Sequence, residues 1–378
     1  MKYTLRHFDT PLLTFEALES SSSPETEILY LNEEKKHLLP LDLEAESSSL
    51  DSWLRHRTIP ANRAFVHAFL AKCGLSMNRP MNIIKVSKGL SMNDCYWVTE
   101  EGFEGTFEKY NLYDNRFSNI LGQIAFTGYG SNVRSSFASC PEFTTNGMLP
   151  KCWRRYKGKI MLFKGGTSGF SNTGNEPYSE YYAAQVAEKA GINAVKYSLS
   201  RWKGSICSAC EIFTSKKYAF MPVGRIVTHG GMEAVRRYYE ELGEEFTNAL
   251  DDMLVLDALI CNTDRHFGNF GFLIDNETNT IAAPAPLFDH GNSLMSLAGN
   301  SDFESREAFE AYTATLMPNT YDDFIGTAGA FLRDEHREML RHMLDFRFRR
   351  HSWYNLPEER LRMIEGFVKS RAAQLLEY

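Results

Sequence analysis

The sequence CNTDRHFGNFGFL, from Cys261 to Leu273, brings an acid, a base, an imidazole and an amide into one short loop. It follows residues 244–261, where apolar side chains recur at the spacing of an amphipathic helix, and it runs into FGFLID, a run typical of a strand. Asp264 and Asn269 stand five positions apart, which is the spacing of the Asp and Asn in the protein-kinase catalytic loop. A polar turn between a helix and a strand could have the same spacing, so the spacing alone does not distinguish a catalytic loop from a polar turn.

Length and charge restrict the class of protein. With 378 residues the chain exceeds the usual size of one hydrophobic core, so two lobes or domains are expected. Lys and Arg number 41 against 48 acids, and the net charge of −7 argues against binding of nucleic acid by the whole surface. The basic run WRRYKGK, at 153–159, is interpreted as a solvated hairpin tip rather than a nucleic-acid site. No direct nucleic-acid binding is expected.

The N-terminus and the cysteines predict a cytoplasmic protein. The first residues, MKYTLRHFDT, lack the apolar core of a signal peptide, and no apolar run reaches the roughly 18 residues of a membrane span. The seven cysteines are odd in number and scattered, unlike a secreted disulfide framework. Cys207 and Cys210 form a lone CxxC without a second pair at zinc spacing, and we interpret them as strand residues.

The order of predicted elements divides the chain into three regions. Residues 1–135 form an N-terminal α/β region of uncertain role. Residues 136–225 form a lobe with a strand that ends in a lysine, a helix and a hinge, and residues 226–378 form a mostly helical lobe that contains the opening sequence. The pattern by itself favours an α+β fold with two lobes and names no reaction.

Individual elements follow from periodicity and from glycine and proline positions. In the first region we predict a helix over 59–74 and strands at NIIKV and CYWVTE, followed by a long loop over 127–147. Later elements are listed in chain order: a strand over 158–166, a helix over 178–192 stopped by Gly191, strands at NAVKYSL, SICSACEIF and YAFMPVGRIV, the helix 244–261, a hairpin and C-terminal helices.

Four elements in this order match the requirements of phosphoryl transfer: a cation for nucleotide phosphates, oxygen ligands for Mg²⁺, and an acid beside the acceptor hydroxyl. Lys164 ends a predicted strand, and Glu180 lies in the next helix, where it could pair with that lysine. Asp264 would face the acceptor. Asn269, together with Asp289 in the later LFDHGNS, would hold the metal. The combination favours a catalytic loop over a polar turn.

The runs NTDRHFGN, from Asn262, and APLFDHG resemble the C-terminal kinase domain of the HipA-like family of bacterial serine/threonine kinases, whose catalytic loop reads N-x-D-x-H-x-x-N. The likeness covers roughly Ser139 to the C-terminus. It implies a bilobal, protein-kinase-like fold with a mixed N-terminal lobe and a mostly helical C-terminal lobe. It also implies ATP and Mg²⁺ as cofactors, a protein substrate, autophosphorylation and a toxin–antitoxin setting with an antitoxin-like partner.

The resemblance assigns roles to the residues that match its motifs. Asp264 would be the catalytic base, Asn269 and Asp289 the Mg²⁺ ligands, and Lys164 a contact to the nucleotide phosphates. Glu180 belongs to the same nucleotide-binding group.

Three further residues receive roles with alternatives. Glu211 and Phe213 would lie in the hinge beside adenine, although Phe213 could equally be a core strand residue. His266 would reach the phosphates or the metal-bound loop, or it could brace the loop by a hydrogen bond.

The phosphate cover is predicted in FTTNG, before the lysine strand, where Thr144, Thr145 and Gly147 could present backbone N–H groups. The alternative is KGGTSGFSNTG after that strand, and neither run fits a Walker motif. The family carries a phosphorylatable serine in this part of the fold, so the candidates for autophosphorylation are Ser135, Ser136 and Ser139.

The sequence departs from the eukaryotic kinase pattern at Asn262, which replaces the His of H-R-D, and at His290, which replaces the Phe of D-F-G, and no A-P-E follows. DRHFGN also resembles the loop of phosphoinositide kinases, so a lipid kinase is one alternative, although no membrane signal supports it. A pseudokinase that binds nucleotide without turnover is another.

Overall fold

The computed structural model describes residues 1–133, 140–169 and 174–378. The candidate serines Ser135, Ser136 and Ser139 lie outside the described residues. The chain forms two compact units and passes between them more than once. The first unit comprises Met1–Lys164, Ile212–Met221 and Leu273–Ala282, and the second comprises Gly165–Glu211, Pro222–Phe272 and Ala283–Tyr378.

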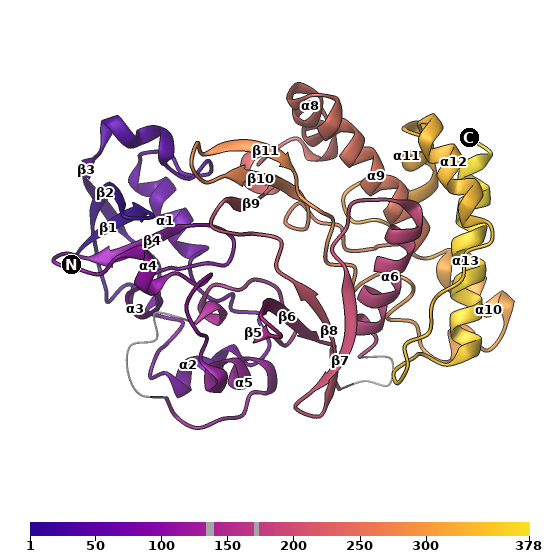
Figure 1. Cartoon of the computed structure of the whole chain (residues 1–378), viewed down its shortest axis with the longest axis horizontal. Coiled ribbons are helices and arrows are strands. Elements are labelled where there is room, and N and C mark those ends of the chain that lie inside the picture. The colour runs from indigo at the N-terminus through magenta and orange to yellow at the C-terminus, as the bar shows by residue number, and fades with distance from the viewer. Residues whose placement is uncertain (134–139, 170–173) are drawn as a thin grey trace. The chain divides into compact units, whose positions relative to one another are not determined.

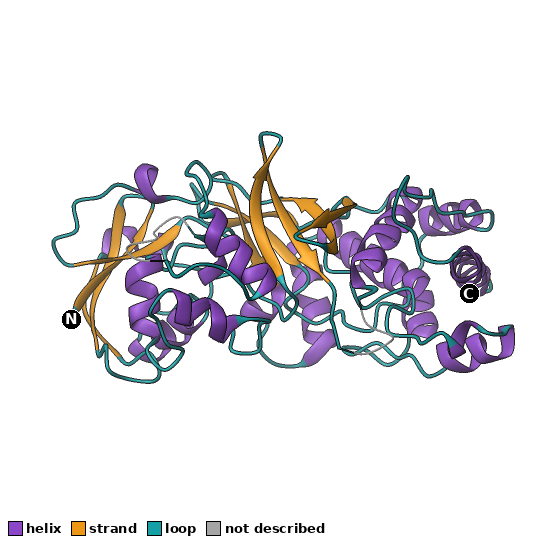
Figure 2. Cartoon of the chain, turned by 90° about the horizontal axis from the view of Figure 1, so that it is seen from below, coloured by secondary structure: helices purple, strands orange, loops and turns teal. Residues whose placement is uncertain are grey.

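An antiparallel sheet opens the first unit. Its strands are β1 (Lys2–His7), β2 (Thr10–Ala17), β3 (Thr26–Leu31) and β4 (Tyr96–Glu100), in the order β3-β2-β1-β4 (Figure 1). Alternate residues of β1 are buried, which is the pattern of a strand with one face on the core. Helices lie beside these strands (Figure 2). The strand predicted at CYWVTE is confirmed as β4.

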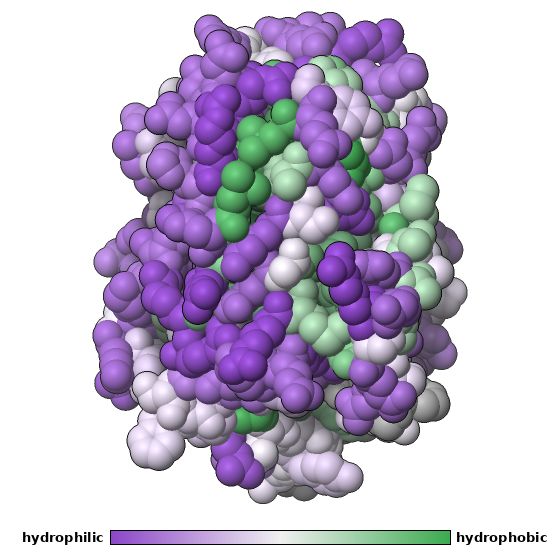
Figure 3. Space-filling model, turned by 90° about the vertical axis from the view of Figure 1, so that its right-hand side faces the viewer, coloured by the Kyte–Doolittle hydropathy of each residue, from purple (hydrophilic) through white to green (hydrophobic). Residues whose placement is uncertain are grey.

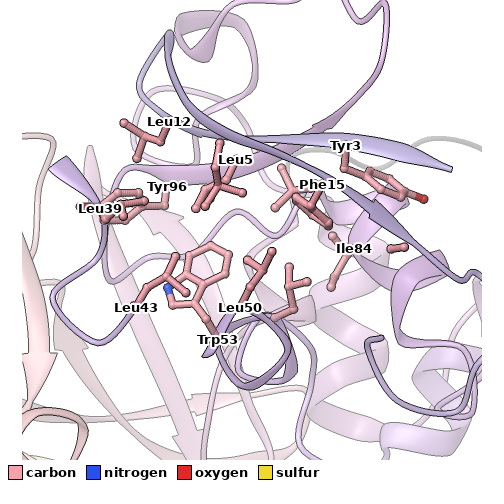
Figure 4. Packing of buried hydrophobic residues seen from close by; sticks show 14 of the residues in the cluster. Tyr3, Leu5, Leu12, Phe15, Leu39, Leu43, Leu50, Trp53, Ile84 and Tyr96 are labelled. Carbon is pink, nitrogen blue, oxygen red and sulfur yellow. The ribbon is translucent and has the colours of Figure 1, made fainter. Parts of the chain in front are cut away.

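The core of this sheet is formed with two helices, α1 (Ser47–Arg55) and α3 (Pro80–Ser87). Figure 4 shows side chains from the sheet meeting Trp53 of α1 and Ile84 of α3. Trp53 is buried and lies edge-on to Tyr96, with ring centroids 6.3 Å apart. Each large apolar side chain contributes about 1.5–3 kcal/mol when fully buried, so this cluster is a major source of stability for the sheet and its two helices.

Two predictions in this region were wrong. NIIKV lies in helix α3, because a short apolar run cannot be told from a strand by periodicity and Pro80 here takes the first helical position. The helix predicted over 59–74 begins only at Val66, as α2 (Val66–Lys72). Phe65 precedes it with a positive φ of 61°, which breaks the helical path upstream.

The rest of the first unit contains short helices and two further groups of strands. A hairpin joins β5 (Lys151–Tyr156) to β6 (Lys159–Gly165), with Lys151 opposite Lys164. Its turn places Lys157 and Gly158 at positive φ, so the basic run at 153–159 is the hairpin tip that we predicted. Further elements are α4 (Phe107–Tyr110), α5 (Asn119–Thr127), the 3₁₀ turns Glu33–Leu38 and Pro141–Phe143, and most of the sheet β11-β10-β9 (Thr280–Pro284, Gly271–Asp275, Tyr218–Pro222).

The second unit is mostly helical (Figure 2). Helix α6 (Glu176–Ala190) ends at Gly191 with φ 71°, as predicted, and the hairpin β7 (Tyr197–Trp202) and β8 (Ser205–Glu211) follows. Cys207 and Cys210 are buried in β8, so their interpretation as strand residues is confirmed. The later helices are α7 (Val223–Ile226), α8 (Gly231–Leu242), α9 (Glu244–Ile260), α10 (Arg306–Thr313), α11 (Phe324–Ala330), α12 (Asp334–Met343) and α13 (Glu358–Leu376).

Helix α9 is the centre of this unit. It lies against α6, α8, α11 and α13, and every residue from Met253 to Ile260 is buried. The helix predicted over 244–261 is thus confirmed, although it is apolar on more than one face because it is surrounded. The outer face of the unit, seen in Figure 3, is largely hydrophilic with a narrow apolar stripe. Within the described ranges, no helix is both long and apolar enough to span a membrane.

Candidate active site

The opening sequence forms a loop directly after α9, which ends because Cys261 takes a left-handed conformation with φ 52°. The loop bonds to itself. The Asp264 N–H donates to Asn262 Oδ1 at 3.2 Å, and the Asn269 N–H donates to the His266 carbonyl at 2.9 Å. Asn269 Nδ2 donates to the Asp264 carbonyl at 3.3 Å. The Asn269 side chain therefore turns back toward Asp264, while the Asp264 carboxylate stays partly exposed.

A buried ion pair holds this loop on α9. Arg265 has no exposed surface, and its Nε and Nη2 each donate to a carboxylate oxygen of Asp257 at 2.9 Å. Burial would lower the pKa of Arg265, but the Asp257 carboxylate outweighs it and the pKa of Arg265 is raised. Arg265 is therefore a structural cation. The feature of the sequence that could have predicted this ion pair is Asp257, the single acid in the apolar run of the preceding helix.

Arg265 also reaches the loop that carries Asp289. Its Nη1 donates to the Phe288 carbonyl at 2.7 Å, and its Nη2 lies 3.1 Å from His290 Nδ1. Because a guanidinium has no acceptor, this contact requires an unprotonated Nδ1 on His290. One side chain thus fixes the positions of the base candidate and the metal-ligand candidate.

The Asp289 loop is held from the other side by α6 and β7. The His290 N–H donates to Glu180 Oε2 at 3.0 Å, and Ser179 Oγ donates to the His290 carbonyl at 2.9 Å. Asp289 itself has φ 58°, and its N–H donates to the Tyr197 hydroxyl at 3.2 Å. Burial raises the pKa of Tyr197, so this hydroxyl stays neutral. A non-glycine residue at positive φ is strained and is often found at functional sites.

The donor set fits a magnesium ion that also binds substrate phosphates. Asn269 uses its amide nitrogen on the loop, which leaves its Oδ1 for a cation, and Asp289 supplies a carboxylate that is partly exposed. Mg²⁺ commonly takes one or two protein carboxylates plus phosphates and waters. Within the part of the chain that is described, no group of three or more His, Cys, Asp or Glu side chains forms a closed metal cage.

Two phenylalanines of the loop are packed in the interior, and His266 makes a hydrogen bond within the loop. Phe270 and Phe272 are buried, and Phe272 packs on Tyr239 with ring centroids 4.9 Å apart. His266 is exposed, and its Nδ1 accepts a hydrogen bond from the Gly268 N–H at 3.1 Å. This contact supports the interpretation of His266 as a brace of the loop.

Gly224 of α7 is expected to be essential for seating this loop. Its N–H donates to the Phe267 carbonyl at 3.0 Å, and a Cβ at this position would lie 2.8 Å from the Phe267 Cβ. We expect Gly224→Ala to lower the free energy of unfolding by about 1–3 kcal/mol because the added methyl overpacks the contact. Urea denaturation measures this.

The matched control is Gly366→Ala in α13, where a Cβ meets nothing within 4 Å. Since alanine favours helix, this change should be neutral or stabilise by up to about 1 kcal/mol. Equal denaturation midpoints for Gly224→Ala and wild type would show that Phe267 can move aside.

The remaining predicted residues lie in the first unit or at its boundary. Lys164 is buried at the end of β6. Phe213 lies after β8, is half-buried and packs edge-on against Phe220, with ring centroids 5.4 Å apart. Glu211 is the exposed last residue of β8, in the second unit.

The predicted phosphate cover is tied to the hairpin. Thr145 Oγ1 donates to the Pro141 carbonyl at 2.7 Å and accepts from Trp153 Nε1 at 3.1 Å. Gly147 has φ 90°, and a Cβ there would collide with Lys151 Nζ at 2.1 Å. The Lys151 ammonium thus lies against the backbone of Gly147, so the predicted phosphate cover carries a positive charge beside its turn.

Comparison with solved structures identifies the fold. Superposition on HipA from Shewanella oneidensis MR-1, solved with HipB and operator DNA, gives a TM-score of 0.53 at 12% identity and covers 100% of this chain and 97% of that one. The chain therefore has the mixed α/β fold of the HipA-like kinases, and the predicted fold class is confirmed.

Sequence comparison finds a partial similarity to a named kinase. The chain is 28% identical over 141 residues to the serine/threonine-protein kinase CtkA of Helicobacter pylori. This match covers 32% of the chain and 41% of CtkA, so it spans about two fifths of that relative's length. The crystal structure of CtkA, described as a proinflammatory kinase, has a TM-score of 0.48 and 18% identity over 60% of this chain and 91% of that one. No family model matches. The resemblance to HipA-like serine/threonine kinases is confirmed.

Proposed function

We propose that this chain is an ATP- and Mg²⁺-dependent serine/threonine protein kinase of HipA-like type. The observation that carries the proposal is the double attachment of Arg265. Because one buried guanidinium binds the Asp264 loop to α9 and to the Asp289 loop, the groups that must act together are held on one rigid frame. Preorganisation of this kind is the main contribution of a protein to phosphoryl transfer, where little covalent chemistry is needed.

In the proposed reaction, Asp264 accepts the proton of the acceptor hydroxyl as its oxygen bonds to the γ-phosphorus. The bond from that phosphorus to the β,γ-bridging oxygen breaks, and ADP leaves with the bridging oxygen's electron pair. Asn269 and Asp289 would hold Mg²⁺, which would neutralise charge on the transferred group. For the nucleotide, the proposal assigns phosphate contact to Lys164, phosphate cover to Thr145 and Gly147, and adenine contact to Glu211 and Phe213.

The direct test is transfer of label from [γ-³²P]ATP with Mg²⁺ to the chain itself, to a mixed protein substrate and to phosphatidylinositol vesicles. Nucleotide binding is measured in parallel by calorimetry. Label on protein supports the kinase. Binding of ATP without label on any protein, in the presence of Mg²⁺, favours the pseudokinase instead, and label found on phosphatidylinositol vesicles alone favours the lipid kinase.

Lys164 provides a second prediction. Lys164→Met keeps the aliphatic stem but removes the charge, so we expect KM for ATP to rise roughly 10- to 100-fold, the value of one charged hydrogen bond. Initial rates over a range of ATP concentrations measure it. Lys159→Met, at the exposed start of the same strand, is the control and should behave as wild type. A lowered melting temperature with unchanged KM would mean that Lys164 is structural.

An antitoxin-like protein partner is also part of the proposal, supported by the HipB complex of the structural neighbour. Affinity purification of the tagged chain from its native host, followed by mass spectrometry, tests it. Recovery of one protein in stoichiometric amount, which stays bound when the sample is diluted, supports a stable complex. Recovery of the chain alone contradicts it.

A further inference from the structure

Two asparagine side chains bind the Asp264 carboxylate, and neither belongs to the catalytic loop. Asn292 Nδ2 donates to Asp264 Oδ2 at 3.0 Å, and Asn319 Nδ2 approaches Asp264 Oδ1 at 3.4 Å. Asn292 follows Asp289 by three residues. Asn319 lies 55 residues beyond Asp264, in the segment between α10 and α11.

We propose that Asn292 and Asn319 are positioning residues that form an amide clamp on the Asp264 carboxylate and orient it toward the acceptor hydroxyl. This inference rests on the proposed kinase function. An ionised carboxylate has two acceptor sites on each oxygen, so one amide on each leaves an acceptor site for the incoming hydroxyl. Without a partner, the terminal torsion of an aspartate is broad, and the oxygen would be displaced for much of the time.

The clamp consists of neutral groups, and this matters chemically. A lysine or arginine in the same place would favour the charged carboxylate and weaken it as a proton acceptor. An amide fixes the direction of the carboxylate without adding a formal charge. The described side chains that hydrogen-bond to this carboxylate are these two amides.

Both asparagines are themselves anchored to the parts that they align. The Asn292 carbonyl accepts from the Thr263 N–H and the Thr263 hydroxyl, both at 3.1 Å. Next to Asn319, Thr320 Oγ1 donates to the Arg265 carbonyl at 2.9 Å. Each amide is therefore placed by a hydrogen bond to a neighbour of Asp264. Because Asn292 is partly buried with the shorter contact and Asn319 is exposed with the longer one, Asn292 should contribute more.

The experiment compares Asn292→Ala, Asn292→Asp and Asn319→Ala in the full chain, with kcat and KM for ATP measured separately. Loss of alignment near a reacting atom costs up to about 10²-fold. We expect kcat to fall about 10-fold or more for Asn292→Ala and about threefold or more for Asn319→Ala, with KM for ATP within twofold of wild type. Asn292→Asp should fall further than Asn292→Ala, because it puts a second carboxylate 3.0 Å from Asp264.

The control is Asn300→Ala, an exposed asparagine between the two clamp segments, which should keep wild-type kcat. The order of the two Asn292 variants separates a clamp from a packing role, because aspartate preserves shape and alanine does not. The clamp is overturned, without affecting the proposed function, if kcat of Asn292→Asp equals or exceeds that of Asn292→Ala. It is also overturned if kcat stays within twofold of wild type in all variants. A wild-type chain that binds ATP and transfers no phosphoryl group overturns both the clamp and the proposed function.

Discussion

Asp264→Asn should reduce phosphoryl transfer by about 10²- to 10⁴-fold, the usual contribution of a general base. Asparagine has the shape of aspartate, so the loop hydrogen bonds made by the backbone of residue 264 should persist. It cannot accept the proton of the acceptor hydroxyl. Affinity for ATP and the melting temperature should therefore stay close to wild type while kcat collapses.

The measurement is a steady-state rate at saturating ATP with nucleotide binding measured on the same preparation. Asp322→Asn is the matched control, an exposed aspartate in the segment that follows Asn319, and it should retain full activity. Full activity in purified Asp264→Asn protein would exclude Asp264 as the base and would require another acid to take its role.

Arg265→Met should destabilise the second unit by about 3–5 kcal/mol, because removal of one member of a buried ion pair leaves the other charge without compensation. Asp257 has no exposed side-chain surface, and it would lose both bonds from the guanidinium. The Phe288 carbonyl would also lose its donor. Urea denaturation at neutral pH measures the effect.

Two variants test the cause of this loss. Arg306→Met removes an exposed pair with Glu310, whose arginine side chain is 85% accessible, and it should cost no more than about 0.5 kcal/mol. Combining Asp257→Leu with Arg265→Met removes both buried charges, so part of the lost stability should return. A double variant no more stable than Arg265→Met would show that packing, and not the uncompensated charge, dominates.

Sequence-based prediction was accurate where the residues that determine an element lie within that element, and it failed where distant packing decides. Helix α6 was predictable because its apolar spacing and the glycine at 191 are contained in the helix itself. NIIKV was assigned wrongly because five residues carry too little periodicity, and its helical state depends on packing beneath the sheet β3-β2-β1-β4. The hydrogen bond that Glu180 accepts from the His290 N–H was not predicted, because it joins segments 110 residues apart.

By itself, the sequence determined which chemical groups the proposed phosphoryl transfer would use and their order, from Lys164 through Asp264 and Asn269 to Asp289. Local spacing was sufficient for this because each motif is a few residues long. Tertiary structure alone decided what holds those groups. Arg265 donates to the Phe288 carbonyl 23 residues further on, and Asn319 reaches Asp264 across 55 residues. Hydrogen bonds between segments so far apart depend on packing of the whole unit, and no short pattern in the chain encodes them.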